Sequence, residues 1–183
     1  MIKINAIDLD KTLIPFDSYR TLILTYLHRK YYLNIVAIHV LFRKLRLTKN
    51  GTFKYNTLGL LRKDRTYEHM VQEIAEMIML SLRPEVMEAV DNETDPHTAN
   101  VIVSASPEDY VRVVARKLGW SFIASRIADN EFVHCYGQNK IELLQKYYPR
   151  DKYLYNFAIS DSDSDLEMLK MFEKHQLLQN SSL

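Results

Sequence analysis

Short apolar runs and longer amphipathic stretches alternate along most of the chain. Residues 2–8 form an apolar run that ends in acids, and residues 100–103 and 153–159 have the same apolar character. Such runs predict short strands that are buried in a sheet. The remaining strand predictions are a last strand over residues 175–178 and a β-hairpin over residues 122–136, turning near Asp129 and Asn130.

Apolar residues that recur every three or four positions predict helices in other segments. Ser106 is placed to cap one of these helices, with Pro107 at its first position, and Gly119 suits its end. Proline at a first helical position also predicts that a helix opens at Pro84. The other predicted helices cover residues 68–82, 139–148 and 163–172.

A long segment between the first two predicted strands lacks strand character. Its pattern is helical from residue 17 to about residue 47, breaks at residues 50–52, and ends in a polar linker over residues 91–98. An insert of about eighty residues is too long for a loop, so we expect a helical, lid-like subdomain. The sequence therefore predicts an α/β fold, in which residues 1–14 and 99–183 form a Rossmann-like parallel sheet core and residues 15–98 form a helical cap.

Composition and charge narrow the setting of the protein. The formal net charge of +1 gives no global field that favours nucleic acid, and nucleic-acid motifs are absent. The single cysteine, Cys135, excludes a disulfide within the chain and favours a reducing, cytoplasmic location. The N-terminus reaches Asp8 before it can form the apolar core of a signal peptide, so we expect no export.

The predicted cap contains an apolar run and a segregated charge pattern. Residues 31–42 would span only about 18 Å as a helix, too short to cross a bilayer, although a helix lying on a membrane surface stays open. Residues 17–65 hold eleven Lys and Arg against two acids, and residues 66–98 hold eight acids against Arg83. These halves are either solvated faces that attract each other, or a basic lid surface for an anionic substrate or membrane.

Two acids follow the first predicted strand, where open parallel sheets bind their ligands. Asp8 and Asp10 lie two residues apart, so in extended backbone their side chains point to the same side. Carboxylates this close repel each other unless a cation lies between them or one is protonated. Both arrangements suit phosphate chemistry, because Mg²⁺ prefers oxygen ligands and a protonated acid can serve a leaving group. Alternatively, Asp8 and Asp10 are two ordinary acids in a turn that follows a strand, without a shared function.

Two further segments are candidates for binding an anion. Ser104 follows the second predicted strand and precedes a helix N-terminus, whose amide groups and dipole favour phosphate. Lys140 lies at the start of a predicted helix, where its charge meets the positive end of the dipole. That placement needs a compensating anion, either a carboxylate or a phosphate, unless Lys140 is a solvated surface residue.

A dense acidic cluster follows the strand predicted at residues 153–159. Asp161, Asp163 and Asp165 alternate with serines just before a helix. Asp163 or Ser162 can cap that helix, whereas Asp161 and Asp165 are costly without a cation nearby. The cluster therefore points to a bound cation.

In this order and at these strand ends, the four segments resemble the motifs of the haloacid dehalogenase-like (HAD) superfamily over nearly the whole chain. Residues 8–12 are similar to its Asp-x-Asp-x-Thr motif, Ser104 to its second-motif hydroxyl residue, and Lys140 to its third-motif lysine. Residues 161–165 are similar to its Asp-Ser-x-x-Asp motif. The insert between the first two motifs resembles the helical cap of the phosphoserine-phosphatase-like branch.

The resemblance implies a Mg²⁺-dependent phosphomonoester hydrolase that acts through an aspartyl-phosphate. Asp8 would attack phosphorus, and Asp10 would protonate the leaving alkoxide and then activate water. Mg²⁺ would be held by Asp8, Asp161 and Asp10, the last through its backbone carbonyl, while Asp165 would orient Lys140 or metal-bound water. The residues implied to bind the phosphoryl group are Thr12, Ser104, Ala105 through its amide, and Lys140.

Some positions depart from this branch and leave the substrate open. Asp17 replaces a glutamate nine residues after the nucleophile and is one methylene shorter, and no cap arginine stands in a matching context. Phosphoserine is therefore not favoured. A small phosphorylated metabolite fits a closed lid, whereas a lipid phosphate fits the basic, aromatic and apolar run over residues 19–47. The third alternative is a catalytically silent binding protein that keeps the fold, although such a protein would be expected to lose Asp8 or Asp10.

Overall fold

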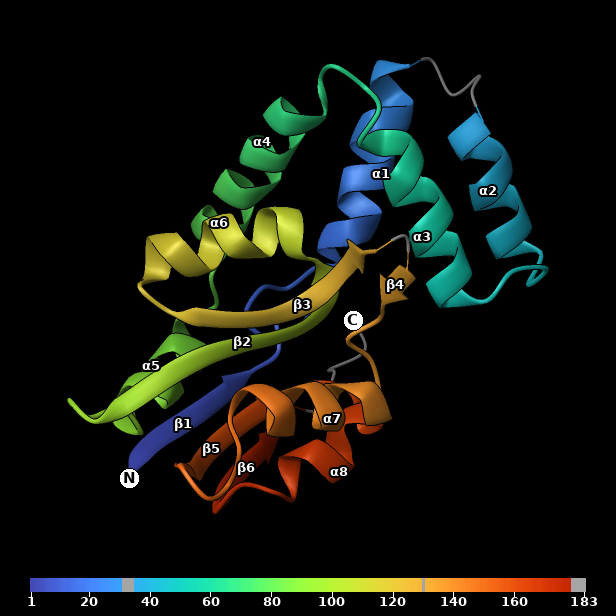
Figure 1. The fold of residues 1–183 in the computed structure, drawn as a ribbon. Coiled ribbons are helices and arrows are strands. Elements are labelled where there is room, and N and C mark those ends of the chain that lie inside the picture. Colours follow the sequence, from blue (N-terminus) through green and yellow to red (C-terminus); the bar gives the residue numbers. More distant parts are fainter. Residues whose placement is uncertain (31–34, 130, 179–183) are drawn as a thin grey trace.

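The computed structural model describes residues 1–30, 35–129 and 131–178. Its centre is a six-stranded sheet in the order β4-β3-β2-β1-β5-β6, in which every pair is parallel except the β3–β4 hairpin (Figure 1). This arrangement confirms the predicted α/β fold class. The strands are β1 (Ile2–Ile7), β2 (Thr98–Pro107), β3 (Ser121–Ala128), β4 (Glu131–Val133), β5 (Tyr153–Ser160) and β6 (Lys174–Leu177).

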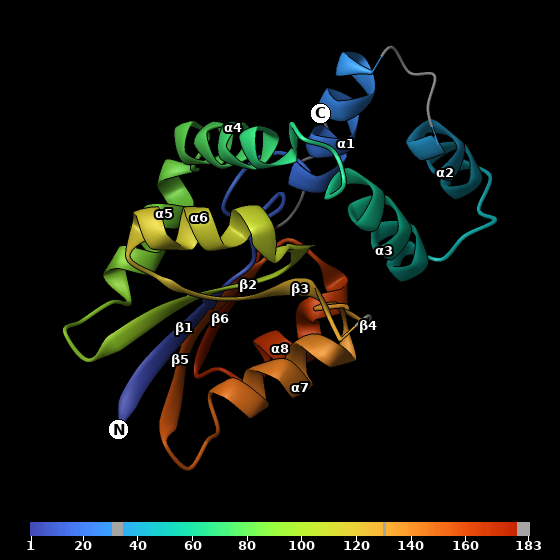
Figure 2. The same ribbon diagram turned by 45° about the horizontal axis from the view of Figure 1, so that its top comes forward.

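Helices cover both faces of the sheet and also form a separate group beside it. In Figure 2, α4, α5 and α6 lie on one side of the strands and α7 and α8 on the other, while α1, α2 and α3 extend away from the sheet. The helices are α1 (Ser18–Arg29), α2 (Ile35–Lys44), α3 (Asn50–Leu61), α4 (Tyr67–Leu80), α5 (Pro84–Asn92), α6 (Glu108–Leu118), α7 (Gln138–Tyr147) and α8 (Leu166–Leu169), the last preceded by a 3₁₀ turn over Asp163–Asp165.

Alternating residues of the central strands explain the two buried faces. Ile102 of β2 belongs to the cluster under α4, α5 and α6, whereas its neighbours Val101 and Val103 belong to the cluster under α7 and α8. Successive side chains of a strand point to opposite faces, so a strand covered on both sides reads as a continuous apolar run. This is the pattern that predicted the strands.

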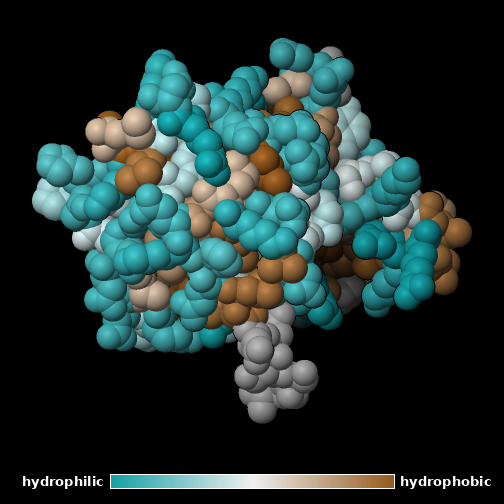
Figure 3. Space-filling view, turned by 90° about the horizontal axis from the view of Figure 1, so that it is seen from below, coloured by the Kyte–Doolittle hydropathy of each residue, from teal (hydrophilic) through white to brown (hydrophobic). Residues whose placement is uncertain are grey.

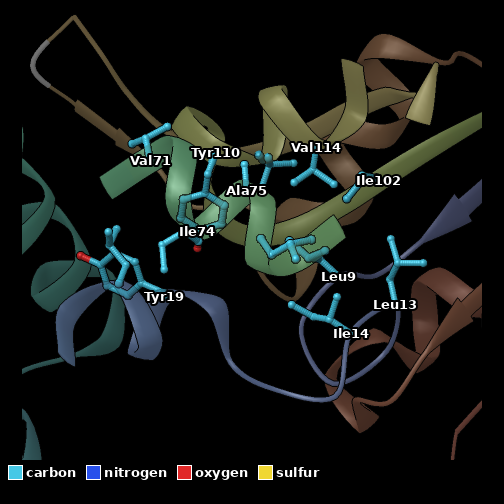
Figure 4. Packing of buried hydrophobic residues seen from close by; sticks show 14 of the residues in the cluster. Leu9, Leu13, Ile14, Tyr19, Val71, Ile74, Ala75, Ile102, Tyr110 and Val114 are labelled. Carbon is cyan, nitrogen blue, oxygen red and sulfur yellow. The ribbon is translucent and has the colours of Figure 1, made fainter. Parts of the chain in front are cut away.

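The segment after β1 is anchored in the same core. Figure 4 shows Leu9, Leu13 and Ile14 pointing into the cluster that contains Ile102 of β2 and Ile74 of α4, and all five side chains are at most 1% exposed. Burying such side chains stabilises a fold by roughly 1.5 to 3 kcal/mol each. The backbone that carries the acids on either side of Leu9 is therefore held firmly.

In the part of the predicted insert that the structure describes, five helices, α1 to α5, lie between β1 and β2. Not all of them leave the core: α4 packs on α6 and on α1, and Val86 and Val90 of α5 are buried in the main cluster. The cap boundaries at residues 15 and 98 stay a prediction. The part of the insert that stands apart from the sheet is formed by α1, α2 and α3 (Figure 2).

Three local predictions are wrong. Residues 50–52 are not a break but the first turn of α3; the chain instead breaks just before them, where Arg46 has a φ of 59°. Ser106 does not cap α6, because its hydroxyl binds a side chain elsewhere and Pro107 takes the cap position. The helix predicted over residues 163–172 is reduced to the 3₁₀ turn and the four residues of α8.

Other local predictions hold. Pro84 opens α5, and Gly119 ends α6 with a left-handed φ of 71°. The hairpin turns at Asp129, whereas Asn130 and residues 31–34 lie outside the described residues. Within the described ranges, no helix is both long and apolar enough to cross a membrane.

Candidate active site

The predicted site residues meet at the carboxyl edge of the sheet. A cavity of about 280 Å³ opens there, above the ends of β1, β2 and β5. Ligands bind at this edge in open parallel sheets, because the loops that leave neighbouring strands converge on it. The lining includes the predicted Asp8, Asp10, Ser104, Ala105, Lys140, Asp161 and Asp165, together with Asp17, Asn50 and Lys54 from the insert.

Lys140 joins two buried carboxylates at the floor of the cavity. Its Nζ donates to Oδ1 of Asp8 at 2.7 Å and to Oδ2 of Asp165 at 2.6 Å. Lys140 and Asp165 are each 2% exposed, and Asp8 is 7% exposed. Oδ2 of Asp165 also accepts the Ser160 hydroxyl at 2.7 Å. The anion that a lysine at the start of α7 needs is thus a pair of carboxylates.

Burial and charge act in opposite directions on this group. Burial raises the pKa of Asp8 above its ordinary value, and the adjacent Lys140 ammonium opposes that rise. For Lys140, burial alone lowers the pKa, but Asp8 and Asp165 outweigh it and the net pKa is raised. Lys140 therefore stays a fixed positive charge, and any further cation beside Asp8 would favour its ionised, nucleophilic form.

Asp10 faces the insert rather than Lys140. Its Oδ1 accepts the backbone amide of Ser18, the first residue of α1, at 2.7 Å, and its Oδ2 accepts the Ser106 hydroxyl. Burial raises the pKa of Asp10, while these hydrogen bonds oppose the rise. A raised pKa is the direction that suits a carboxyl group acting as a general acid and base.

A buried hydroxyl network supports Asp10. The Ser18 hydroxyl lies 3.1 Å from that of Ser106 and 2.9 Å from that of Tyr110, and all three residues are fully buried. This network links the start of α1, the end of β2 and α6. Neither Ser18 nor Tyr110 stood out in the sequence, because their function depends on contacts about ninety positions apart along the chain.

Thr12 lies beneath the cavity instead of lining it. Its Oγ1 accepts the backbone amide of Asp161 at 2.8 Å and donates to Oδ1 of Asp161 at 3.2 Å. This pair ties the turn after β1 to the turn after β5. Thr12 is fully buried, so the contact seen here is with Asp161, and its implied phosphate contact stays a prediction.

Ser104 and Ala105 lie where β2 loses its regular pairing with β3. The Ser104 hydroxyl accepts the amide of Ser106 at 3.1 Å, which supports this irregular end of β2. The carbonyl of Ala105 accepts the Ser125 hydroxyl at 2.9 Å. Side chain and backbone donors at this end of β2, just before the N-terminus of α6, suit an anion next to Lys140.

Lys54 is a site residue that the sequence analysis did not single out. It extends from α3 into the cavity, where its Nζ donates to the Ala105 carbonyl at 2.8 Å and lies 5.4 Å from the centre of the Tyr19 ring. It is 8% exposed, and burial lowers its pKa against the opposing effect of Asp10, Asp17 and Asp8. The available signal was its helical spacing with Leu58 and Leu61, which put a lysine on an apolar face.

The oxygen donors of the site suit a hard cation. Asp8 and Asp161 line the cavity from neighbouring strands, whereas the Asp10 carboxylate is engaged by Ser18 and Ser106. Among the described residues, no three acidic, histidine or cysteine side chains form a metal-binding group. Two carboxylates with neighbouring backbone oxygens are donors of the kind that Mg²⁺ prefers, and binding of Mg²⁺ by Asp8, Asp161 and the Asp10 carbonyl stays a prediction.

Fold and site together define a Rossmann-like α/β protein with a buried acidic edge under a helical insert. The chain belongs to the haloacid dehalogenase-like hydrolases, because the model of that family matches residues 6–170. This match confirms the predicted family and the prediction that the protein is an enzyme, a hydrolase. A search of curated proteins gave no match.

Solved structures share the fold at low sequence identity. A protein of unknown function from Bordetella pertussis Tohama I is 18% identical with a TM-score of 0.75, over 96% of this chain and 89% of that one. A phosphoserine phosphatase solved as an analogue of its phospho-aspartyl intermediate is 17% identical with a TM-score of 0.62, over 95% of this chain and 85% of that one. A HAD family hydrolase from Salmonella enterica serovar Typhi is 14% identical with a TM-score of 0.67, over 93% of this chain and 60% of its own length.

Proposed function

We propose that the protein is a Mg²⁺-dependent phosphomonoester hydrolase that uses Asp8 as its nucleophile. The observation that carries the proposal is the buried Asp8–Lys140–Asp165 group at the carboxyl edge of the sheet, with Asp10 held beside it. Charge neutralisation and positioning supply most of the catalysis of phosphoryl transfer. The phosphoserine phosphatases that share the fold support this reaction class.

The proposed reaction has two steps, formation of an aspartyl-phosphate and its hydrolysis. A carboxylate oxygen of Asp8 attacks phosphorus, the bond from phosphorus to the alcohol oxygen breaks, and Asp10 gives its proton to that oxygen. Water then attacks the phosphorus of the aspartyl-phosphate and loses a proton to Asp10, which releases inorganic phosphate and restores Asp8. Lys140, the Ser104 hydroxyl and the Ala105 amide would bind the phosphoryl oxygens.

The proposal includes a metal ion because the site offers oxygen atoms that can bind one. Asp8, Asp161 and the Asp10 carbonyl would hold Mg²⁺, which when bound neutralises negative charge on the phosphoryl group. Asp165 would keep Lys140 in place through their 2.6 Å contact.

Phosphoserine itself is not the substrate that we propose. The residue in place of the branch's glutamate, Asp17, caps α1, and its Oδ1 accepts the Arg20 amide at 2.8 Å. Arg62 is also engaged, through bonds of 3.1 and 2.8 Å to Asp109. We therefore assign the choice of a small phosphorylated substrate to the other residues that the insert contributes, Lys54 above all.

The test is phosphate release from p-nitrophenyl phosphate and a panel of phosphometabolites, with Mg²⁺ and with EDTA. We expect metal-dependent turnover in the wild type and none in Asp8→Asn. Turnover that survives in Asp8→Asn would contradict the assigned nucleophile. No turnover on any ester by a folded wild type would instead favour the silent binding protein.

A lipid phosphate remains the second candidate, because α2 exposes an apolar surface. Of its ten residues only Val36 is buried, and Ile35, Ile38, Leu41 and Phe42 are exposed. Figure 3 shows hydrophobic residues gathered at the right-hand edge, the side on which α2 lies in Figure 1. Arg43 and Lys44 end the same helix. If the lipid hypothesis holds, the protein floats with anionic vesicles at low salt; a protein that stays in the dense fraction contradicts it.

A further inference from the structure

We propose that the insert binds an apolar chain carried by the alcohol of the substrate, so that the enzyme acts on phosphate monoesters with an apolar tail. This inference rests on the proposed phosphatase function and adds the class of leaving group. It concerns a single substrate molecule within the protein, and so it is independent of any contact with a membrane.

A second cavity lies between the three helices that stand apart from the sheet. It has a volume of about 440 Å³, within the range of roughly 300 to 1,000 Å³ that is typical of small-molecule sites. Its walls are mainly apolar, and they come from α1, α2 and α3. The side chains used below are Leu24 and Leu27 of α1, Val40 and Leu41 of α2, and Phe53 of α3.

The apolar groove and the catalytic cavity adjoin each other. Asp17, Asn50 and Lys54 line both of them. Lys54 marks the junction, because its Nζ reaches the carbonyl of Ala105 at 2.8 Å while its helix carries Phe53 into the groove. An ester whose phosphoryl group lies at Asp8 can therefore extend its alcohol past Lys54 and into the groove.

The chemistry of the groove selects an apolar chain over a polar one. Leu24 and Leu41 are 47% and 53% exposed although they border a concave surface, and exposed apolar surface of this kind marks binding sites. Among the described residues that line the groove, Asp17 is the sole acid, and its Oδ1 already accepts the Arg20 amide. An ammonium group on the substrate would thus meet three cations, Lys54, Arg20 and Lys44, against a single carboxylate.

The experiment measures kcat/KM for ethyl, butyl, hexyl and octyl phosphate, each below the concentration at which it aggregates. Each methylene buried in an apolar groove should raise kcat/KM by about fourfold. A flat series, with phosphate released at every length, overturns the inference and leaves the proposed phosphatase intact.

Paired serine substitutions locate the effect. Leu24→Ser combined with Leu41→Ser should lower the octyl-to-ethyl ratio of kcat/KM by about tenfold, because two walls of the groove become polar. Leu80→Ser is the matched control, since Leu80 is 89% exposed on α4 and does not line the groove. An equal fall in Leu80→Ser would mean general adsorption to apolar surface and would overturn the inference.

A binding measurement separates the inference from catalysis. Calorimetry with Asp8→Asn compares the affinities of ethyl and octyl phosphate without turnover. We expect octyl phosphate to bind at least about tenfold more tightly. Equal affinities for ethyl and octyl phosphate overturn the inference, whether or not the wild type hydrolyses any ester. Tight binding of octyl phosphate together with a wild type that hydrolyses no ester overturns only the proposed function.

Discussion

The catalytic edge of the sheet and the outer helices of the insert are built in opposite ways. At the edge, Asp8, Lys140 and Asp165 are almost fully buried and bonded to one another. In the outer helices, α2 buries only Val36, and an apolar groove lies open beside it. A reaction needs charges held in one geometry, whereas recognition of an apolar chain needs area and shape. The contrast agrees with our proposal that chemistry lies in the core and substrate choice in the insert.

The largest expected effect comes from the proposed nucleophile. Asp8→Asn should lower kcat by roughly 10⁴-fold or more, as loss of a nucleophile does in other enzymes. Asp163→Asn is the matched control, because Asp163 is an exposed acid close to the site that does not line the cavity. Steady-state phosphate release measures the activity of both variants. Comparable losses of activity would mean that the negative charge of this region matters, and not the Asp8 carboxylate in particular.

The next effect tests whether the catalytic edge is held together by charge balance. Lys140→Met should remove activity and destabilise the fold by about 3 to 5 kcal/mol, because it leaves two carboxylates buried without their cation. Adding Asp165→Asn should recover part of the stability and none of the activity. Urea unfolding and kcat measure the two properties separately, and an unchanged midpoint in Lys140→Met would contradict the charge-balance account.

Lys54 tests the junction between the two regions. Lys54→Met should lower kcat/KM by roughly 10- to 100-fold, or about 1.4 to 2.7 kcal/mol in the barrier, and change stability little because the buried ammonium is replaced by an apolar side chain of similar length. Lys49→Met, an exposed lysine at the start of the same helix, should behave as the wild type. Equal kinetics for the two variants would place the control of substrate elsewhere in the insert.

The smallest effect concerns pH and the contact between core and insert. His134 stacks between Phe132 and Tyr136 and lies near Gly51 of α3. Burial lowers the pKa of His134 to about 4, with Lys54 adding to the shift. The pKa of histidine in the unfolded chain is about 6.5. The stability that comes from burying His134 as a neutral side chain is therefore complete above pH 6.5 and is lost as the pH falls toward 4.

Comparison with His134→Phe isolates that effect. Between pH 6.5 and 4, the wild type should lose on the order of 1 to 2 kcal/mol more stability than the variant, an amount already reduced for the partial exposure of the ring. Urea unfolding at several pH values gives the difference. Parallel pH dependences of the two proteins would show that His134 is not buried as a neutral side chain.

The order of strands, helices and acidic turns was readable from the sequence, because periodicity and strand ends are local properties. The apolar runs indicated β1, β2 and β5, and Asp8 and Asp161 directly follow β1 and β5, whereas Ser104 lies within β2, which extends to Pro107 instead of ending at residue 103. A parallel sheet brings such turns to one edge, so the proximity of these residues followed from topology. The charge of Lys140 at a helix start also predicted that an anion would lie beside it.

Contacts between distant parts of the chain were decided by the tertiary structure alone. Ser106 has the sequence of a helix cap, yet its hydroxyl donates to Asp10, 96 positions away, because a carboxylate oxygen is a stronger partner for a hydroxyl than a local amide is. Lys54 joined the site, and the groove formed, only because α1, α2 and α3 pack side by side in one particular way. Local patterns set the elements and their chemistry, whereas the partner of each polar side chain depends on which surfaces the folded chain brings together.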